Sequence, residues 1–398
     1  MSRAWLSVVG IGEDGIEGLA PAAHALIADA EILVGGARHL AMVRRTDARR
    51  IAWTGVAEDI DRIVGLRDKR VCVLASGDPM WFGVGAMLAK RVPASEITVA
   101  PHPGAFSLAA ARMVWPLAEV ACLSVHGRPL EAIALHLHHG ARLLVLAEDE
   151  TSAAKLAALL RARGYAKSKV TVLERLGGPN EKIRAGLAAN WRNARRDALS
   201  VIAIEARADR PGVEFPRVGG LPLDAFAHDG QITQPEFRAA ALVALAPTPG
   251  ALLWDIGAGA GSVAIEWMRA GGRAIAVERV SARRDFIARN AVALGVPGLE
   301  IVAGTAPQIL GRLRQPEAIF IGGGTSNAAL LERAWKELPR GGRLVAHAVT
   351  AEGEAALLAF HATMGGELVR LSCARLAPVG RFHRWHPEAP VTQYKSVK

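Results

Sequence analysis

Cysteine is scarce in this sequence of 398 residues, which contains only Cys72, Cys122 and Cys373, far apart and without a CxxC pair. An odd and scattered set argues against a disulfide framework and for a reducing compartment. The histidines between residues 136 and 139 lack acidic partners at ligand spacing, so we predict no metal site. These absences favour a metal-free protein of the cytoplasm.

Long apolar runs are also missing, since none approaches the roughly 18 residues that a membrane-spanning helix needs. The N-terminal apolar patch lacks the length and cleavage site of a signal peptide, and we expect no membrane association. Half of the residues are nevertheless hydrophobic and 22% are charged, which indicates a folded globular protein. A chain of this length exceeds one ordinary core, so two domains are expected.

Acidic residues are outnumbered by basic ones, and the formal net charge is +10. A basic protein can bind nucleic acid, or it can concentrate positive potential in a cleft for a small polyanion. The sequence has no lysine-rich tail and no basic run with interleaved aromatic residues. Charge alone leaves both partners open.

Short apolar runs alternate with helical stretches along the whole chain, which predicts α/β architecture. The segment from 206 to 232 interrupts this alternation with many prolines and glycines, as expected of a linker. We therefore predict an N-terminal domain at 1–206, a linker at 207–228 and a different α/β domain at 229–398.

A glycine loop follows the apolar run Leu252–Ile256 and precedes a helix predicted at Ser262–Arg269, with Ser262 as a possible cap. A strand, a glycine turn and a helix are typical of nucleotide-type sites. The spacing here is GxGxG rather than the dinucleotide pattern GxGxxG, and Asp255 precedes it. A carboxylate disfavours a pyrophosphate but suits a cofactor that carries an ammonium and a sulfonium group.

The ends of the next two predicted strands fit the same ligand. Glu278 ends the strand 274–277 and could accept hydrogen bonds from both hydroxyls of a ribose. The strand Glu300–Ala303 leads to Thr305 and Ala306, where an adenine edge would lie. A glycine turn chosen only for packing would not explain three strand ends in order, so we predict an S-adenosyl-L-methionine site.

Further motifs connect this half to a family. They are the segment Asp229–Thr233, the strand end Gly322–Gly324, the turn Pro339–Arg343 and a strand ending in His347. Together with the glycine loop they resemble the decarboxylating precorrin methyltransferase domain of cobalamin biosynthesis, which has the class I (Rossmann-like) methyltransferase fold. The resemblance implies cofactor contacts from Thr233, Gly257, Ala258, Gly259, Ala260, Gly261, Glu278 and Ala306. Thr305 departs from the family, where an aspartate is common, and no catalytic acid or base is identified.

The N-terminal half begins with a literal GxGxxG, from Gly10 to Gly15. Glu13 and Asp14 lie inside this loop and would repel a pyrophosphate. The next helix is predicted to begin near Pro21, too late for its N-terminus to face the phosphates. Both observations argue against a dinucleotide site.

Four motifs of this half occur in a familiar order: the first glycine loop, Ser76–Gly83 (SGDPMWFG), Pro103–Ala111 (PGAFSLAAA) and Ser124–Gly127 (SVHG). They resemble the tetrapyrrole methylases, two-lobed α/β proteins that use S-adenosyl-L-methionine in a cleft between the lobes. The resemblance implies cofactor contacts near Gly77, Asp78 and Ser107, with the first loop facing the tetrapyrrole.

The fusion of the two families implies a bifunctional enzyme that uses two S-adenosyl-L-methionine molecules. The N-terminal domain would methylate position 5 of precorrin-6B, and the C-terminal domain would methylate position 15 and decarboxylate the ring-C acetate, giving precorrin-8X. An anionic tetrapyrrole then accounts for the basic charge without nucleic acid, and both families suggest homo-oligomers.

Two alternatives stay open at this point. One is an RNA methyltransferase with a basic N-terminal docking domain, although the strand end Gly322–Gly324 lacks an Asn-Pro-Pro-Tyr clamp for a base. The other is a tetrapyrrole carrier without enzyme activity.

Overall fold

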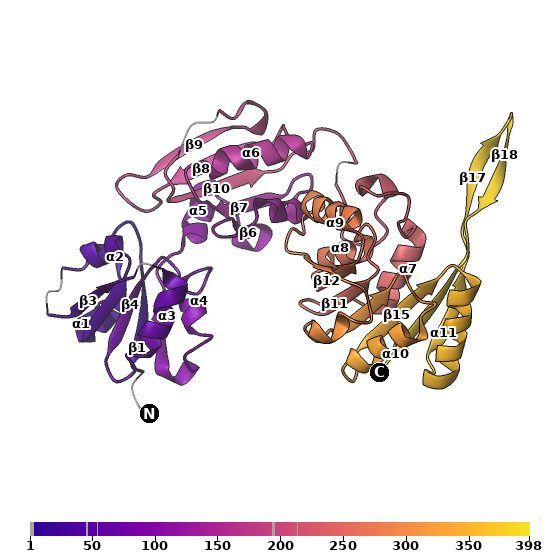
Figure 1. The fold of residues 1–398 in the computed structure, drawn as a ribbon. Helices are drawn as coiled ribbons and strands as arrows, with labels where there is room; N and C mark the ends of the chain where they lie inside the picture. Colours follow the sequence, from indigo (N-terminus) through magenta and orange to yellow (C-terminus); the bar gives the residue numbers. More distant parts are fainter. Residues whose placement is uncertain (1–3, 45–46, 54, 193–195, 213) are drawn as a thin grey trace. The chain divides into compact units, whose positions relative to one another are not determined.

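The chain forms two compact units in a computed structural model that describes residues 4–44, 47–53, 55–192, 196–212 and 214–398 (Figure 1). The N-terminal unit comprises residues 1–128 and 136–213, and the C-terminal unit comprises 129–135 and 214–398. Among the helices in these described ranges, none combines the length and the apolar character that crossing a bilayer requires.

The first lobe of the N-terminal unit is a parallel five-stranded sheet. Its order is β3 (Arg49–Ala52), β2 (Ile32–Gly35), β4 (Val71–Ser76), β1 (Leu6–Ile11) and β5 (Ile97–Ala100). Helices α1 (Pro21–Asp29) and α2 (Ala37–Met42) pack on one face, and α3 (Val56–Val64) and α4 (Val84–Leu88) pack on the other. Helix α1 begins at Pro21, as predicted, because a proline lacks the N–H that the first turn leaves unpaired.

The second lobe of this unit is a mixed sheet of five strands. Its order is β6 (Ala121–Ser124), β7 (Arg142–Leu146), β10 (Ser200–Glu205), β8 (Lys169–Glu174) and β9 (Lys182–Leu187), and only the β6–β7 pair is parallel. Helix α5 (Ala105–Met113) packs through Phe106 and Ala109 on this sheet, and α6 is Ser152–Ala162. The two-lobed α/β organisation predicted from the sequence is confirmed.

The C-terminal unit is built on a seven-stranded sheet. Its order is β13 (Glu300–Ala303), β12 (Arg273–Glu278), β11 (Leu252–Ile256), β14 (Ala318–Ile321), β15 (Arg343–Ala348), β19 (Val391–Val397) and β16 (Glu367–Leu371). The first five strands are parallel, and β19 is antiparallel to both of its neighbours. Chain order reverses at β11, which lies between β12 and β14, and such a switch point opens a crevice at the carboxyl ends of the strands.

Helices cover both faces of this sheet. One hydrophobic core lies between the sheet and helices α7 (Pro235–Leu245), α8 (Ser262–Arg269) and α9 (Ser281–Ala293). A second core lies between the sheet and helices α10 (Ala328–Glu337) and α11 (Ala351–Met364). A hairpin of β17 (Ala374–Val379) and β18 (Phe382–Pro387), yellow in Figure 1, extends away from the sheet.

A buried ion pair fixes the entry to the C-terminal unit. Arg238 on α7 and Glu266 on α8 are 0% and 2% exposed, and Nε of Arg238 donates to a carboxylate oxygen of Glu266 over 2.7 Å. The same carboxylate accepts hydrogen bonds from the backbone N–H groups of Gly220 and Leu221. The guanidinium also donates to the carbonyl oxygens of Leu221 and Thr233. The pair therefore holds the segment before α7 against two helices.

We predict that Glu266→Gln destabilises the C-terminal unit by about 3–5 kcal/mol, because it leaves a buried guanidinium without its counter-charge. Urea unfolding monitored by tryptophan fluorescence would measure the loss. Glu300→Gln serves as the control, since Glu300 is largely exposed where it pairs with Arg314 over 2.6 Å. That substitution should cost less than about 1 kcal/mol. Equal losses in the two variants would contradict the structural role of the buried pair.

Candidate functional site

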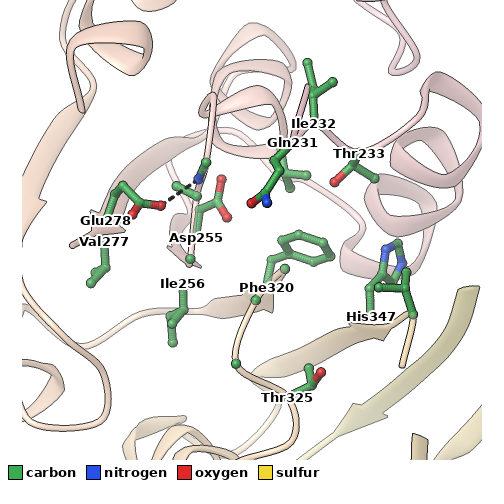
Figure 2. Close-up of a pocket in the computed structure, with 18 of the residues that line it drawn as sticks. Gln231, Ile232, Thr233, Asp255, Ile256, Val277, Glu278, Phe320, Thr325 and His347 are labelled. Carbon is green, nitrogen blue, oxygen red and sulfur yellow. Dashed lines mark hydrogen bonds between the residues drawn. The ribbon is translucent and has the colours of Figure 1, made fainter. Parts of the chain in front are cut away.

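A cavity of about 840 Å³ opens at the carboxyl edge of the seven-stranded sheet, and Figure 2 shows its lining. The ends of β11, β12, β13, β14 and β15 contribute to it, together with the segment before α7. Six of the predicted cofactor residues line this cavity: Thr233, Gly257, Ala258, Gly259, Glu278 and Ala306. Ala260 and Gly261 do not line it, and they complete the loop that leads from β11 into α8.

The glycine loop depends on close backbone approaches. Gly257 has a φ of 70°, and a Cβ there would lie 3.1 Å from the backbone of Gly323 in the loop after β14. Gly261 has a φ of 76° and forms the N-cap of α8, where a Cβ would lie 2.9 Å from Ile287. The expectation that Ser262 caps this helix was wrong, because Ser262 is already its first helical residue. Ala260 is buried, and its carbonyl oxygen accepts a hydrogen bond from Asn290.

Glu278 ends β12 beside the glycine loop, as Figure 2 shows. One of its carboxylate oxygens accepts a hydrogen bond from the N–H of Gly259 over 3.0 Å, and the other accepts one from the N–H of Val280 over 2.9 Å. These two backbone donors fix the carboxylate at the cavity wall, although the side chain is only 4% exposed.

Asp255 is a second carboxylate at this edge. It lies in β11, is 1% exposed and accepts a hydrogen bond from the N–H of Ala264 in the first turn of α8 over 3.0 Å. Burial, opposed by the Ala264 hydrogen bond and reinforced by the nearby charge of Glu278, raises the pKa of Asp255 to about 7. The cavity wall therefore holds an acid whose charge changes near neutral pH.

The far side of the cavity has a different chemistry. His347 on β15 is buried, its Nε2 lies 2.9 Å from the amide oxygen of Gln393, and its ring packs edge-on against Phe320 at 5.1 Å (Figure 2). Burial lowers the pKa of His347, against the opposing effect of the Gln393 hydrogen bond, so the imidazole is neutral at pH 7. The cavity is also lined by Gly322, Gly323 and Gly324, which contribute only backbone because glycine has no side chain.

We predict that Asp255→Asn stabilises the protein above neutral pH. Because the folded pKa lies above the ordinary value of about 4, the folded state binds more protons between about pH 4 and pH 7, and stability falls as pH rises through that window. Asparagine keeps an acceptor for Ala264 but carries no charge. Its melting temperature should exceed that of the parent protein by at least about 2 °C at pH 8, and this gain should shrink toward pH 4.

The matched control for this measurement is Asp285→Asn, an exposed aspartate on α9. Its effect on the melting temperature should be small at both pH values. An Asp255→Asn gain that did not change with pH would contradict the assignment to this carboxylate.

The N-terminal unit has its own cavity of about 730 Å³, lined by residues of both lobes. Gly77, Asp78 and Ser107 all line it. Gly77 has a φ of 52°, and a Cβ there would lie 2.9 Å from Gly104. The loop after β4 and the turn before α5 therefore meet through glycine backbones, and Ser107 follows in the first turn of that helix.

The first glycine loop lies at this cavity too, but its acids are engaged. Glu13 forms ion pairs with Arg38 and, at 3.6 Å, with Arg175. Arg38 lies 2.9 Å from Nε2 of His39. Burial, and then the Arg38 charge, lower the pKa of His39 to about 4. These ion pairs occupy the loop that a pyrophosphate would need, in agreement with the sequence argument against a dinucleotide.

Several lining residues were not predicted from the sequence. In the C-terminal cavity they include Phe320, Arg283 and Val391, and in the N-terminal cavity they include Arg38 and Arg128. Gln231, which also lines the C-terminal cavity, belonged to the recognised segment Asp229–Thr233 but was given no role there. The arginines had no local signal, because tertiary folding alone brings them to the cavities.

Two family models match the chain. Residues 6–190 match the tetrapyrrole (corrin/porphyrin) methylases, and residues 224–398 match the precorrin methyltransferase domain. A curated "precorrin-6Y C(5,15)-methyltransferase [decarboxylating]" from a Sinorhizobium species is 46% identical over 99% of this chain and 96% of its own length. The chain belongs to this family. The resemblances inferred for the two halves are thereby confirmed.

Two shorter relatives each match a part of this chain. A "cobalt-precorrin-7 C(5)-methyltransferase" of Salmonella typhimurium is 28% identical over 51% of this chain and 100% of its own length. A "probable cobalt-precorrin-6B C(15)-methyltransferase (decarboxylating)" of Saccharolobus solfataricus is 32% identical over 34% of this chain and 72% of its own length.

Proposed function

We propose that this protein methylates precorrin-6B at positions 5 and 15 and decarboxylates the ring-C acetate to give precorrin-8X, with two molecules of S-adenosyl-L-methionine. The observation that supports this most directly is the presence of two separate cavities, one in each unit, and each unit matches a different methyltransferase family. A cytoplasmic location and the absence of a nucleic-acid partner belong to the same proposal.

The residues of the C-terminal cavity fit S-adenosyl-L-methionine. Asp255 and Glu278 offer carboxylates for an ammonium group and for ribose hydroxyls, and the positive φ at Gly257 and Gly259 lets a ligand approach the backbone. Thr233 and Ala306 would complete the contacts from opposite walls. In the N-terminal cavity Gly77, Asp78 and Ser107 would hold the second cofactor.

Bound S-adenosyl-L-methionine supplies an activated methyl group to an enamine-like bridge carbon of the reduced tetrapyrrole. The protein's contribution is to hold the two reacting atoms in line, which can account for a large part of the barrier. The glycines from 322 to 324 leave space for a flat macrocycle beside the cavity. In the decarboxylation, the bond to CO2 breaks, the conjugated ring accepts the electron pair, and a proton completes the new methyl group.

The division of labour between the units follows from the separate relatives. The C(5) relative matches 203 residues of this chain, more than the region from 224 to 398 contains, so its match must extend into the N-terminal unit. We assign position 5 to the N-terminal cavity, and position 15 with decarboxylation to the C-terminal cavity.

The decisive experiment incubates the full chain with precorrin-6B and methyl-labelled S-adenosyl-L-methionine and weighs the products. We expect the gain of two methyl groups and the loss of one CO2. Gly259→Asp should abolish methylation at position 15, because a side chain at a φ of 58° and 3.3 Å from the Gln231 carbonyl blocks the loop. The same variant should still methylate position 5.

The other outcomes are equally informative. Label transferred only to RNA would overturn the proposal in favour of an RNA methyltransferase. Tetrapyrrole binding without cofactor binding at either cavity would indicate a carrier. Loss of both methylations in Gly259→Asp would show that the two sites are not independent.

The protein is further proposed to form a homo-oligomer through the β17–β18 hairpin. Both faces of this ribbon are exposed, including Leu376 at 56%, Phe382 at 66% and Trp385 at 67%. Leu376 and Trp385 are cross-strand partners and so lie on one face. An isolated two-stranded hairpin is marginally stable in water, so a second copy that covers this face would stabilise it.

We predict that Leu376→Ser combined with Trp385→Ser shifts the protein toward monomer in sedimentation velocity at micromolar concentration. Leu358→Ser is the matched control, because Leu358 lies on α11 and is 51% exposed. It should leave the sedimentation coefficient unchanged. An unchanged oligomer in the double variant, or a parent protein that is already monomeric, would refute the role of the hairpin.

A further inference from the structure

Two neighbouring aromatic residues line the N-terminal cavity and are left unusually open. Trp81 and Phe82 follow Pro79 in the loop between β4 and α4, and they are 47% and 41% exposed. Large aromatic side chains contribute most when they are buried, so half-exposed rings at a cavity wall indicate a surface that a ligand covers.

The loop that carries these rings is firmly built. A carboxylate oxygen of Asp78 accepts a hydrogen bond from the N–H of Met80 over 2.9 Å, and the carbonyl oxygen of Asp78 accepts one from the N–H of Trp81 over 3.3 Å. A Cβ at Gly83 would lie 2.6 Å from the carbonyl oxygen of Pro79, so only glycine closes this turn. The rings therefore have a fixed backbone beneath them.

A third aromatic residue anchors the pair to the core. Phe106 on α5 is 4% exposed, and its ring centroid lies 5.6 Å from that of Trp81 and 6.1 Å from that of Phe82. These separations are typical of favourable tilted and edge-on aromatic contacts. The aromatic platform, defined as Trp81 and Phe82 on Phe106, thus joins a loop of the first lobe to the helix that packs on the second sheet.

The backbone of Phe82 is strained. Its φ is 56°, in the left-handed region that is a genuine outlier for a bulky residue. Among the described residues, Val114, Arg175 and Ala246 share this conformation. Val114 and Ala246 are C-caps, where it terminates a helix, whereas Arg175 follows β8 and pairs with Glu13 at the same cavity. Phe82 ends no helix, and strain of this kind concentrates at ligand sites.

A cation lies against the platform. The guanidinium carbon of Arg128 lies 4.5 Å from the ring centroid of Phe82, and Arg128 also lines the cavity. Within the described part of the chain no carboxylate forms an ion pair with Arg128, whereas Arg38 at the same cavity is paired with Glu13. Arg128 is thus a positive charge available to an incoming anion.

We propose that the aromatic platform binds one face of the tetrapyrrole during methylation at position 5 and that Arg128 pairs with a peripheral carboxylate of the same macrocycle. This rests on the proposed function and specifies its substrate site in the N-terminal cavity. A flat apolar ring with anionic side chains matches both the exposed rings and the adjoining cation. The sulfonium cofactor is the less suitable occupant, because the guanidinium would repel its positive charge.

The test uses Phe82→Gly in the full-length chain. Glycine adopts a positive φ freely, so this variant should fold at least as well as the parent while it removes the ring. Its KM for the tetrapyrrole in position-5 methylation should rise about tenfold, which corresponds to about 1.4 kcal/mol. The KM for S-adenosyl-L-methionine in that reaction should not change, nor should methylation at position 15 and decarboxylation. Trp81→Ala should behave in the same way.

Val114→Gly is the matched control, because it relieves the same backbone strain at an apolar residue that is 86% exposed and lies outside the cavity lining. It should leave every kinetic constant unchanged. Arg128→Met should raise the KM for the tetrapyrrole and weaken its dependence on ionic strength, and Arg128→Lys should partly restore both.

Three results would overturn the platform proposal. They are an unchanged tetrapyrrole KM in Phe82→Gly and Trp81→Ala, a rise in the cofactor KM instead, or an equal loss in Val114→Gly. A parent chain that fails to methylate position 5 would instead refute the proposed function itself, so the two failures are distinguishable.

Discussion

The buried pair of Arg238 and Glu266 determines how the C-terminal unit presents its cavity. Each charge is satisfied several times over, by the other and by the backbone of the segment that enters α7. Replacing such a pair with apolar residues can be neutral, so its value lies in the arrangement that it fixes rather than in net stability. The Arg238 guanidinium donates a hydrogen bond to the carbonyl oxygen of Thr233, and this contact holds Thr233 at the cavity wall.

The glycine loop depends on that arrangement in turn. Gly259 lies between the Glu278 carboxylate and the Gln231 carbonyl of the held segment, and Gly257 meets the backbone of Gly323. The glycine loop side of the cavity is therefore assembled from backbones that come close to one another, with the Glu278 carboxylate held between them. Such a site suits a reaction in which the cofactor supplies the reactive group and the protein supplies alignment.

The two cavities are each lined by both carboxylates and arginines, but they differ in the groups that are available to a ligand. The C-terminal cavity places Asp255 and Glu278 beside the glycine loop, where positive groups of a cofactor would be favoured. The N-terminal cavity places Arg128 against the ring of Phe82, which favours an anionic and flat ligand.

The sequence predicted the alternation of strands and helices, the bounds of β11 and β13, and the start of α1 at Pro21, because apolar periodicity and proline geometry act locally. It also predicted the glycine loop and Glu278, since both follow directly from strand ends. It misplaced the helix cap at Ser262, because Gly261 in a left-handed conformation forms the N-cap instead, and Ile287 of α9 leaves no room there for a side chain.

The sequence by itself determined the family, because the motifs that identify it can be recognised from their order along the chain. Only the tertiary structure decided which residues share a cavity. Arg128 comes from the second lobe and meets Phe82 of the first, and Val391 comes from a C-terminal strand and lines the same cavity as the loop after β11. Such neighbours are separated by tens of residues or more, and no local rule of propensity or spacing connects them; the packing of sheets and helices does.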